Sequence, residues 1–220
     1  MSAIGLVSTL RHRGISDAPS ALSLSAADAG LILARVATIL LGIAALLAWA
    51  GFELVFRTPG AASSWRGDAR DRASTPLLVL AFAVAAILPG ALRGVAFGSV
   101  GWAAWAGVGL CLFGLAMRAW SMGTLGGSYT RTLRTAPGQQ LVTGGPYRWV
   151  RHPGYAGSIL VWVGAALAFH SWLAALIVAA LMLLSYGWRI HSEERMLAGH
   201  FGDVYRDYAA RTSRLFPGLY

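Results

Sequence analysis

The sequence predicts an all-α integral membrane protein, with about five transmembrane helices and a cytoplasmic C-terminal amphipathic helix. Of its 220 residues, 56% are hydrophobic and only 12% are charged, whereas soluble domains carry roughly 25% charged residues. The apolar residues fall in long uncharged runs of the length that crosses a bilayer. All 18 basic side chains other than histidine are arginines, and they cluster between these runs. This distribution favours membrane topology over nucleic-acid binding as the reason for the positive charge.

Three apolar runs fill the first half of the chain. They are residues 30–52, 76–92 and 94–117. Arg35 lies near the start of the first run, where a long side chain can reach the membrane surface, and Arg118 ends the third. The third run is rich in Gly and Ala, which let membrane helices approach closely. The preceding residues 1–29 are expected to form a loose tail or a surface helix, since no signal peptide is evident.

A fourth apolar stretch contains no Asp, Glu, Lys or Arg for 36 residues, from Pro153 to Trp188. As one helix it would measure roughly 54 Å, far more than a hydrocarbon core of about 30 Å. His170-Ser171 is the polar pair near its middle. We therefore expect two crossings, 154–169 and 172–188, joined by a tight turn at this pair. Residues 189–212 are expected to follow as one amphipathic surface helix.

Five crossings place the two ends of the chain on opposite sides of the membrane. One side then carries 14 of the 18 arginines, and the positive-inside rule makes that side cytoplasmic. The N-terminus is expected outside. The lysine-free, Ala- and Gly-rich composition suggests a bacterial inner membrane. The expected divisions are a tail (1–29), three transmembrane helices (30–118) and a core of connector, helical hairpin and C-terminal helix (119–220).

This topology brings distant polar residues together. His152 lies just before the fourth crossing, and Glu193 and Glu194 lie just after the fifth. A helical hairpin returns both its ends to the same membrane face, so Arg151 and His152 should neighbour the two glutamates. Acids, a histidine and arginines beside an apolar bundle suit a ligand that is both polar and charged.

Simpler explanations exist for each of these residues, and several chemistries are excluded. Arg148 and Arg151 could serve only as positive-inside anchors, His152 could cap a helix start, and the glutamates could form a solvated helix start. Without lysine there is no phosphate-binding loop of the Walker type, and no His-Glu-x-x-His motif occurs. Cys111 is the only cysteine, so no intrachain disulfide can form. No metal site is expected.

The ordered motifs of the second half are more specific than any single residue. They are LVTGGPY at 141–147, VRHPGYAG at 150–157, EERML at 193–197 and FGxxYxxY at 201–208. Together they closely resemble the isoprenylcysteine carboxyl methyltransferase family, whose wider clan includes phospholipid methyltransferases. The resemblance covers about residues 121–217 and implies an integral membrane methyltransferase that uses S-adenosyl-L-methionine at the cytoplasmic face.

Carried over by position, the resemblance implies the residues that bind this cofactor. They are Leu141, Val142, Gly145, Pro146, Tyr147, His152, Pro153, Tyr155, Gly157, Glu193 and Glu194. Arg151 and Glu194 are assigned to catalytic roles. The expected acceptor is a lipophilic small molecule or lipid in the membrane, with carboxylate O-methylation favoured and amine N-methylation possible. The alternatives are an NADPH-dependent sterol-type reductase and a non-catalytic membrane protein of the same fold.

Overall fold

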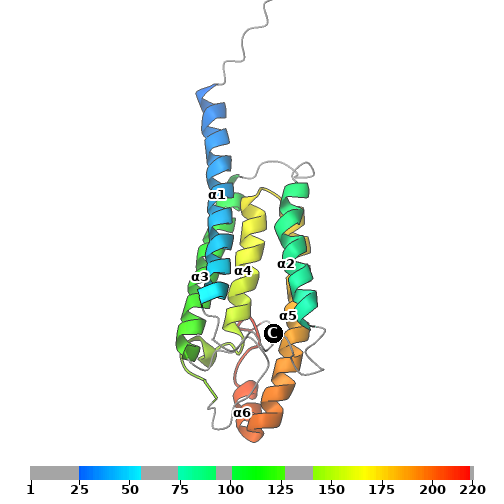
Figure 1. Ribbon diagram of the computed structural model, residues 1–220. Coiled ribbons are helices and arrows are strands. Elements are labelled where there is room, and N and C mark those ends of the chain that lie inside the picture. The colour runs from blue at the N-terminus through cyan, green and yellow to red at the C-terminus, as the bar shows by residue number, and fades with distance from the viewer. Residues whose placement is uncertain (1–24, 56–73, 93–100, 127–140, 219–220) are drawn as a thin grey trace, which may run out of the picture. The chain divides into compact units, whose positions relative to one another are not determined.

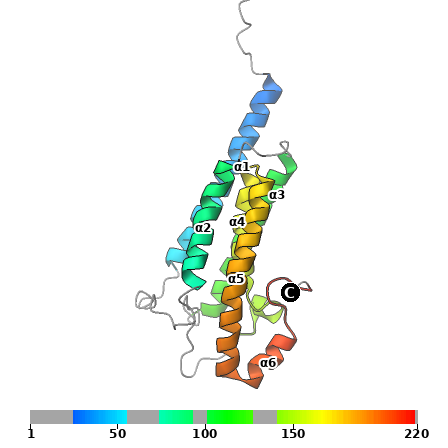
Figure 2. The same cartoon turned by 90° about the vertical axis from the view of Figure 1, so that its right-hand side faces the viewer.

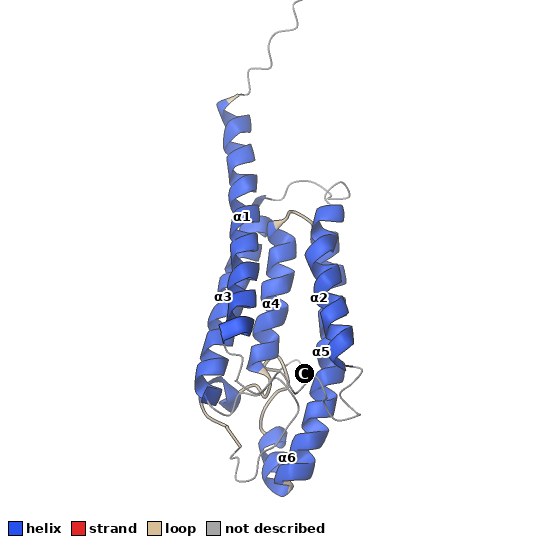
Figure 3. Cartoon of the chain, in the orientation of Figure 1, coloured by secondary structure: helices blue, strands red, loops and turns tan. Residues whose placement is uncertain are grey.

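The structure is a computed structural model that describes residues 25–55, 74–92, 101–126 and 141–218. Every regular element within these ranges is helical (Figure 3). The chain divides into two compact units, residues 1–34 and 35–220, and the helix contacts and the candidate site lie within the second unit. Three helices are long and apolar enough to cross a membrane, and two shorter apolar helices accompany them. The predicted all-α integral membrane fold is confirmed.

Each of the five apolar helices overlaps one of the five predicted crossings (Figure 1). They are α1 (Ala26–Val55), α2 (Ser74–Ala91), α3 (Gly101–Leu125), α4 (Pro153–Ala168) and α5 (Trp172–Phe201). A short 3-10 helix, η4 (Gly145–Arg148), precedes α4, and α6 (Asp203–Ala210) follows α5. The first 34 residues contribute the beginning of α1 within the described part. The predicted tail up to residue 24 and residues 127–140 of the predicted connector lie outside the described residues, and the division into three parts stays a prediction.

Two predicted helix ends are wrong. Arg118 does not end the third crossing, because α3 continues to Leu125 and buries the arginine, which is only 5% exposed. Residues 189–212 do not form one separate helix, because α5 continues without a break to Phe201. Gly202 ends α5 with φ +60, a backbone conformation that glycine adopts readily, and the short α6 then starts. The predicted turn at His170-Ser171 is confirmed, and the Ser171 hydroxyl caps α5 by accepting from the Ala174 amide.

Helices α3 and α4 pack through two pairs of glycines. A Cβ on Gly107 would lie 2.5 Å from the carbonyl oxygen of Gly164, and a Cβ on Gly114 would lie 2.6 Å from that of Gly157. From Gly107 to Gly114 the chain of α3 advances by seven residues, whereas their partners on α4 go back by seven, from Gly164 to Gly157. The two helices therefore cross antiparallel. Because the obstructing atoms belong to the backbone, they cannot move aside cheaply. This contact fixes the position of α4, whose first turn carries the candidate site.

Aromatic rings join the remaining helices around α4. Trp49 of α1 lies 5.3 Å from Trp162 of α4 between ring centroids, and Phe82 of α2 stacks on Trp162 at 5.2 Å. Tyr186 of α5 meets Phe82 edge-on. Helix α5 also packs along α2 and α4, and Figure 2 shows α2 beside α5. The apolar core therefore holds both helices of the hairpin from the side opposite α3.

The glycine contact yields a direct test of the fold. Gly107→Ala should lower the unfolding free energy in detergent by about 2 kcal/mol, because its methyl group would clash with the backbone of α4. Gly109→Ala is the matched control on the same helix, since nothing lies within 4 Å of a Cβ there. That variant should unfold like the wild type or at slightly higher temperature. Equal thermal stability of the two variants would contradict the described crossing.

Candidate active site at the start of α4 and the end of α5

The backbone before α4 is held by the C-terminal segment of the chain. Val150 and Ser213 form a parallel bridge, in which the Arg151 amide donates to the Ser213 carbonyl at 2.8 Å. The His152 amide donates to the Arg214 carbonyl at 3.0 Å. His152 then occupies the N-cap position of α4. Pro153 begins the helix at a position whose backbone N–H would have no partner within the helix, so the N–H that proline lacks is not missed. Sequence reasoning did not anticipate this pairing, which adds a third segment to the site.

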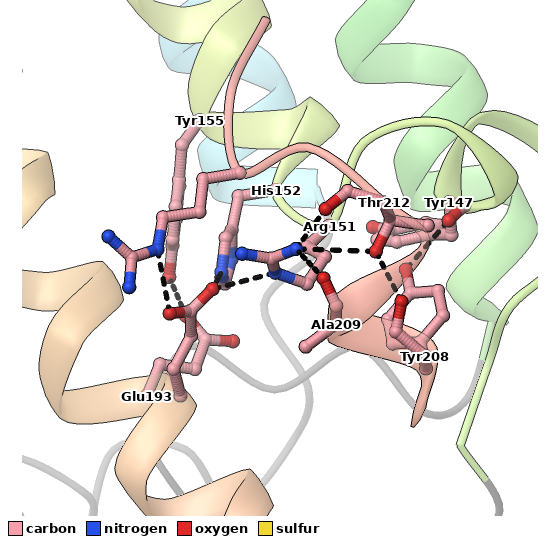
Figure 4. Close-up of polar contacts among 10 residues, drawn as sticks. Tyr147, Arg151, His152, Tyr155, Glu193, Tyr208, Ala209 and Thr212 are labelled. Carbon is pink, nitrogen blue, oxygen red and sulfur yellow. Dashed lines mark hydrogen bonds and ion pairs between the residues drawn. The ribbon is translucent and has the colours of Figure 1, made fainter. Parts of the chain in front are cut away.

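Arg151 is the central cation of the site. Its Nε donates to Glu194 Oε1 at 2.8 Å, and its Nη1 donates to the Ala209 carbonyl at 2.8 Å and to the Thr212 carbonyl (Figure 4). The side chain is 9% exposed. One guanidinium thus ties the start of α4 to the end of α5 and to the end of α6. A planar fork of donors can make these bonds at once, which a lysine could not.

The two glutamates meet His152 and Tyr155, as the hairpin topology predicts. The Tyr155 hydroxyl donates to Glu193 Oε2 at 2.8 Å, and His152 Nδ1 lies 3.8 Å from the same oxygen. His152 Nε2 lies 3.4 Å from Glu194 Oε1. The imidazole and the Tyr155 ring are nearly parallel, with centroids 5.6 Å apart. The predicted convergence of the two ends of the hairpin is confirmed.

The remaining predicted residues lie in η4 or in the stretch before it, apart from Gly157 in α4. Pro146 and Tyr147 are buried in η4, and the Tyr147 carbonyl accepts from the Tyr208 hydroxyl at 2.7 Å, which docks η4 onto α6. Gly145 has φ +57 and lies against Thr124 of α3. Leu141 and Val142 are half-buried in the irregular stretch before η4. In the structure, the close approach that Gly157 permits is that of α3.

Three residues of the site were not assigned from the sequence. The Arg189 Nε donates to the Tyr155 hydroxyl at 3.0 Å, and Arg214 donates to Glu194 Oε2 at 2.9 Å. Arg189 is 8% exposed and stands one helical turn before Glu193, a spacing that could have identified it. The Tyr205 hydroxyl is buried without a hydrogen-bond partner among the described residues.

Burial keeps the tyrosines of α6 neutral. Loss of solvation raises the pKa of Tyr208 to about 12, although Arg151 opposes the shift. Burial also raises the pKa of Tyr205 well above its usual value. Both hydroxyls are therefore hydrogen-bond donors at physiological pH. Tyr208 donates to the Tyr147 carbonyl, whereas the Tyr205 hydroxyl has no hydrogen-bond partner among the described residues.

Fold and site together define a polytopic helical membrane protein that gathers charged and aromatic side chains at one end of an apolar bundle. Residues 107–199 match the model of the isoprenylcysteine carboxyl methyltransferase (ICMT) family, the same family that the sequence motifs resemble. The matched region contains the glycine contact of α3 and α4, the first turn of α4 and both glutamates.

Individual proteins of this family are also similar to the chain. The chain is 28% identical over 118 residues to the protein-S-isoprenylcysteine O-methyltransferase of Rattus norvegicus, covering 53% of this chain and 42% of that protein. It is 30% identical over 113 residues to a probable protein of the same name from Oryza sativa subsp. indica, covering 50% and 59%. The nickel-cobalt-cadmium resistance protein NccN of Alcaligenes xylosoxydans xylosoxydans is 39% identical over 80 residues, covering 36% and 37%. The chain thus spans about half the length of the curated relatives it matches.

A solved structure shares the fold. It is that of a eukaryotic intramembrane Ras methyltransferase, isoprenylcysteine carboxyl methyltransferase, with a TM-score of 0.57 and 23% sequence identity. The match covers 66% of this chain and 53% of the other.

The bonding of Arg151 leads to a stability prediction. Arg151→Met should lower the unfolding free energy by about 3 kcal/mol, because it removes one charged partner of the largely buried Glu194 carboxylate and the donor of two carbonyls. Arg206→Met is the control, because that arginine pairs with Asp203 on an exposed surface and should cost less than about 1 kcal/mol. Denaturant unfolding in detergent measures both. A loss for Arg151→Met no larger than for the control would contradict the bonding described.

Proposed function

We propose that this chain is a membrane methyltransferase that transfers a methyl group from S-adenosyl-L-methionine to a lipophilic, membrane-embedded acceptor. The observation that carries the proposal is the convergence of His152 and Tyr155 with Glu193 and Glu194, inside the region that matches the methyltransferase family. The positive-inside rule supports a cytoplasmic site and an outside N-terminus. The lysine-free, Ala- and Gly-rich composition suggests a bacterial inner membrane.

The residues present fit this cofactor chemically. Its ribose hydroxyls and its ammonium group require acceptors, which the carboxylates of Glu193 and Glu194 provide. Its own carboxylate requires a donor, and the Tyr205 hydroxyl is the candidate. Its flat adenine suits the stacked rings of His152 and Tyr155. The backbone of residues 141–147 is proposed to line the same pocket.

The cofactor supplies an electrophilic methyl group on a sulfonium, which leaves as a neutral thioether when an acceptor atom takes the methyl. The protein has to align the two partners and to exclude water. Arg151, bonded to Glu194 and to α6, positions the carboxylate and ties α6 to the site. Arg189 follows the apolar part of α5 directly, which makes it the candidate to orient an acceptor that arrives from the bilayer.

The ion pairs of Glu194 favour a carboxylate as the methyl acceptor. A carboxylate is nucleophilic without deprotonation, whereas an ammonium acceptor would first have to lose a proton to a base. Glu194 is held by the guanidinium groups of Arg151 and Arg214, which makes it a poor proton acceptor. The methyltransferase relatives from Rattus norvegicus and Oryza sativa act, by their names, on isoprenylcysteine. For this chain we propose the broader class, a lipophilic carboxylic acid.

Ligand-induced stabilisation separates this proposal from the reductase alternative. S-Adenosyl-L-methionine and S-adenosylhomocysteine should raise the melting temperature of the detergent-purified protein, and NADPH should not. Glu193→Gln should weaken the binding of both nucleosides about tenfold, because a hydrogen bond to a charged group contributes about 1.5–3 kcal/mol. Stabilisation by NADPH alone would refute the methyltransferase proposal.

The free donor of Tyr205 gives a finer test of the pocket. Tyr205→Phe should weaken S-adenosylhomocysteine binding about fivefold, which corresponds to one hydrogen bond of about 1 kcal/mol. It should not destabilise the ligand-free protein, because the hydroxyl is buried without a described partner. Tyr208→Phe is the matched control and should lower stability instead, since it breaks the bond to Tyr147. Unchanged affinity in Tyr205→Phe would remove that hydroxyl from the pocket.

A further inference from the structure

A second cluster of polar side chains lies inside the bundle, between α1, α3 and α4. Arg118 of α3 pairs with Glu53 of α1 and donates to Ser158 Oγ of α4 at 2.7 Å. It also donates to the Gly154 carbonyl at 3.0 Å. The Trp49 indole donates to the same serine at 3.0 Å, and the guanidinium lies 5.8 Å from the centre of its ring. The side chain of Arg118 is 6% exposed and that of Glu53 is 18% exposed.

Stability alone is a weak reason for such an ion pair. Removing two charges from water costs several kcal/mol for each ion, and apolar side chains of similar volume are often equally stable or more so. A charged residue inside a membrane bundle therefore suggests a further role. What distinguishes this pair is that Arg118 also donates to Gly154 and Ser158, at the start of α4.

The first turn of α4 carries the candidate site on its other face. Gly154, whose carbonyl accepts from Arg118, directly precedes Tyr155, whose hydroxyl binds Glu193 and Arg189. Ser158 lies one turn further on and also donates to the Gly154 carbonyl. The bonds from Arg118 therefore fix the rotation of this turn about the axis of α4. That rotation sets where the rings of His152 and Tyr155 point.

We propose that Arg118 and Glu53 are positioning residues of the active site. They hold the first turn of α4 so that His152 and Tyr155 meet the glutamates of α5 in the geometry that binds the cofactor. This inference rests on the proposed function for its ligand. It gives α1 a part in the site, although no residue of α1 lies in the region that matches the family.

A paired substitution separates positioning from stability. Arg118→Met alone removes the guanidinium that pairs with the largely buried Glu53 carboxylate, so this variant should lose both stability and ligand binding. The double variant Arg118→Met/Glu53→Met removes both charges and should regain a melting temperature near that of the wild type. It should still bind S-adenosylhomocysteine about tenfold more weakly. Wild-type affinity in the double variant would overturn the proposal.

Arg35→Met is the control for loss of an arginine from an apolar helix, because this side chain is exposed on α1. It should leave both stability and affinity unchanged. A second readout needs no ligand: hydrogen exchange of the amides from 150 to 158 should be faster in the double variant than in the wild type. Unchanged exchange would refute positioning. If exchange changes but wild-type protein binds neither nucleoside, the proposed function fails while the positioning role stands.

Discussion

The ion pair between Arg151 and Glu194 is the interaction on which the site depends. It joins residues 43 positions apart, and the same guanidinium binds the last turn of α6. One guanidinium therefore joins the start of α4, the end of α5 and the C-terminal segment, and Arg214 adds a second bond from that segment to Glu194. Because the pair is largely buried, its attraction is little screened by solvent. The Glu193–Tyr155 bond and the two contacts of His152 lie beside this link.

The apolar bundle supports the link by fixing the two helices that carry it. The glycine pairs set α4 against α3 at backbone contact, and the rings of Trp49, Phe82 and Trp162 fill the opposite side. Helix α5 is 30 residues long, or about 45 Å, so its last turns extend beyond a hydrocarbon core of about 30 Å. Those turns carry the glutamates into a polar environment, while the preceding turns stay beside the lipid that would deliver an acceptor.

Hydropathy was enough to locate the five apolar helices, and the hairpin turn then placed His152 beside Glu193. The end of α3 was mispredicted because a charge normally marks the membrane edge, whereas Arg118 is compensated by Glu53, 65 residues earlier. No local pattern could reveal that partner. The bridge between Val150 and Ser213 is likewise a long-range backbone contact. Arg189 was missed although its spacing from Glu193 is visible in the sequence.

Transfer of labelled methyl groups tests the central claim most directly. Purified wild-type protein, S-adenosyl-L-methionine labelled in its methyl group, and a membrane lipid extract should give label in the organic phase. Base should release this label as methanol, as expected of a methyl ester. Glu193→Gln, prepared in the same way, should reduce that incorporation at subsaturating cofactor concentration. Wild-type protein that binds neither the cofactor nor its product, and that transfers no label to any membrane fraction, would contradict a methyltransferase function.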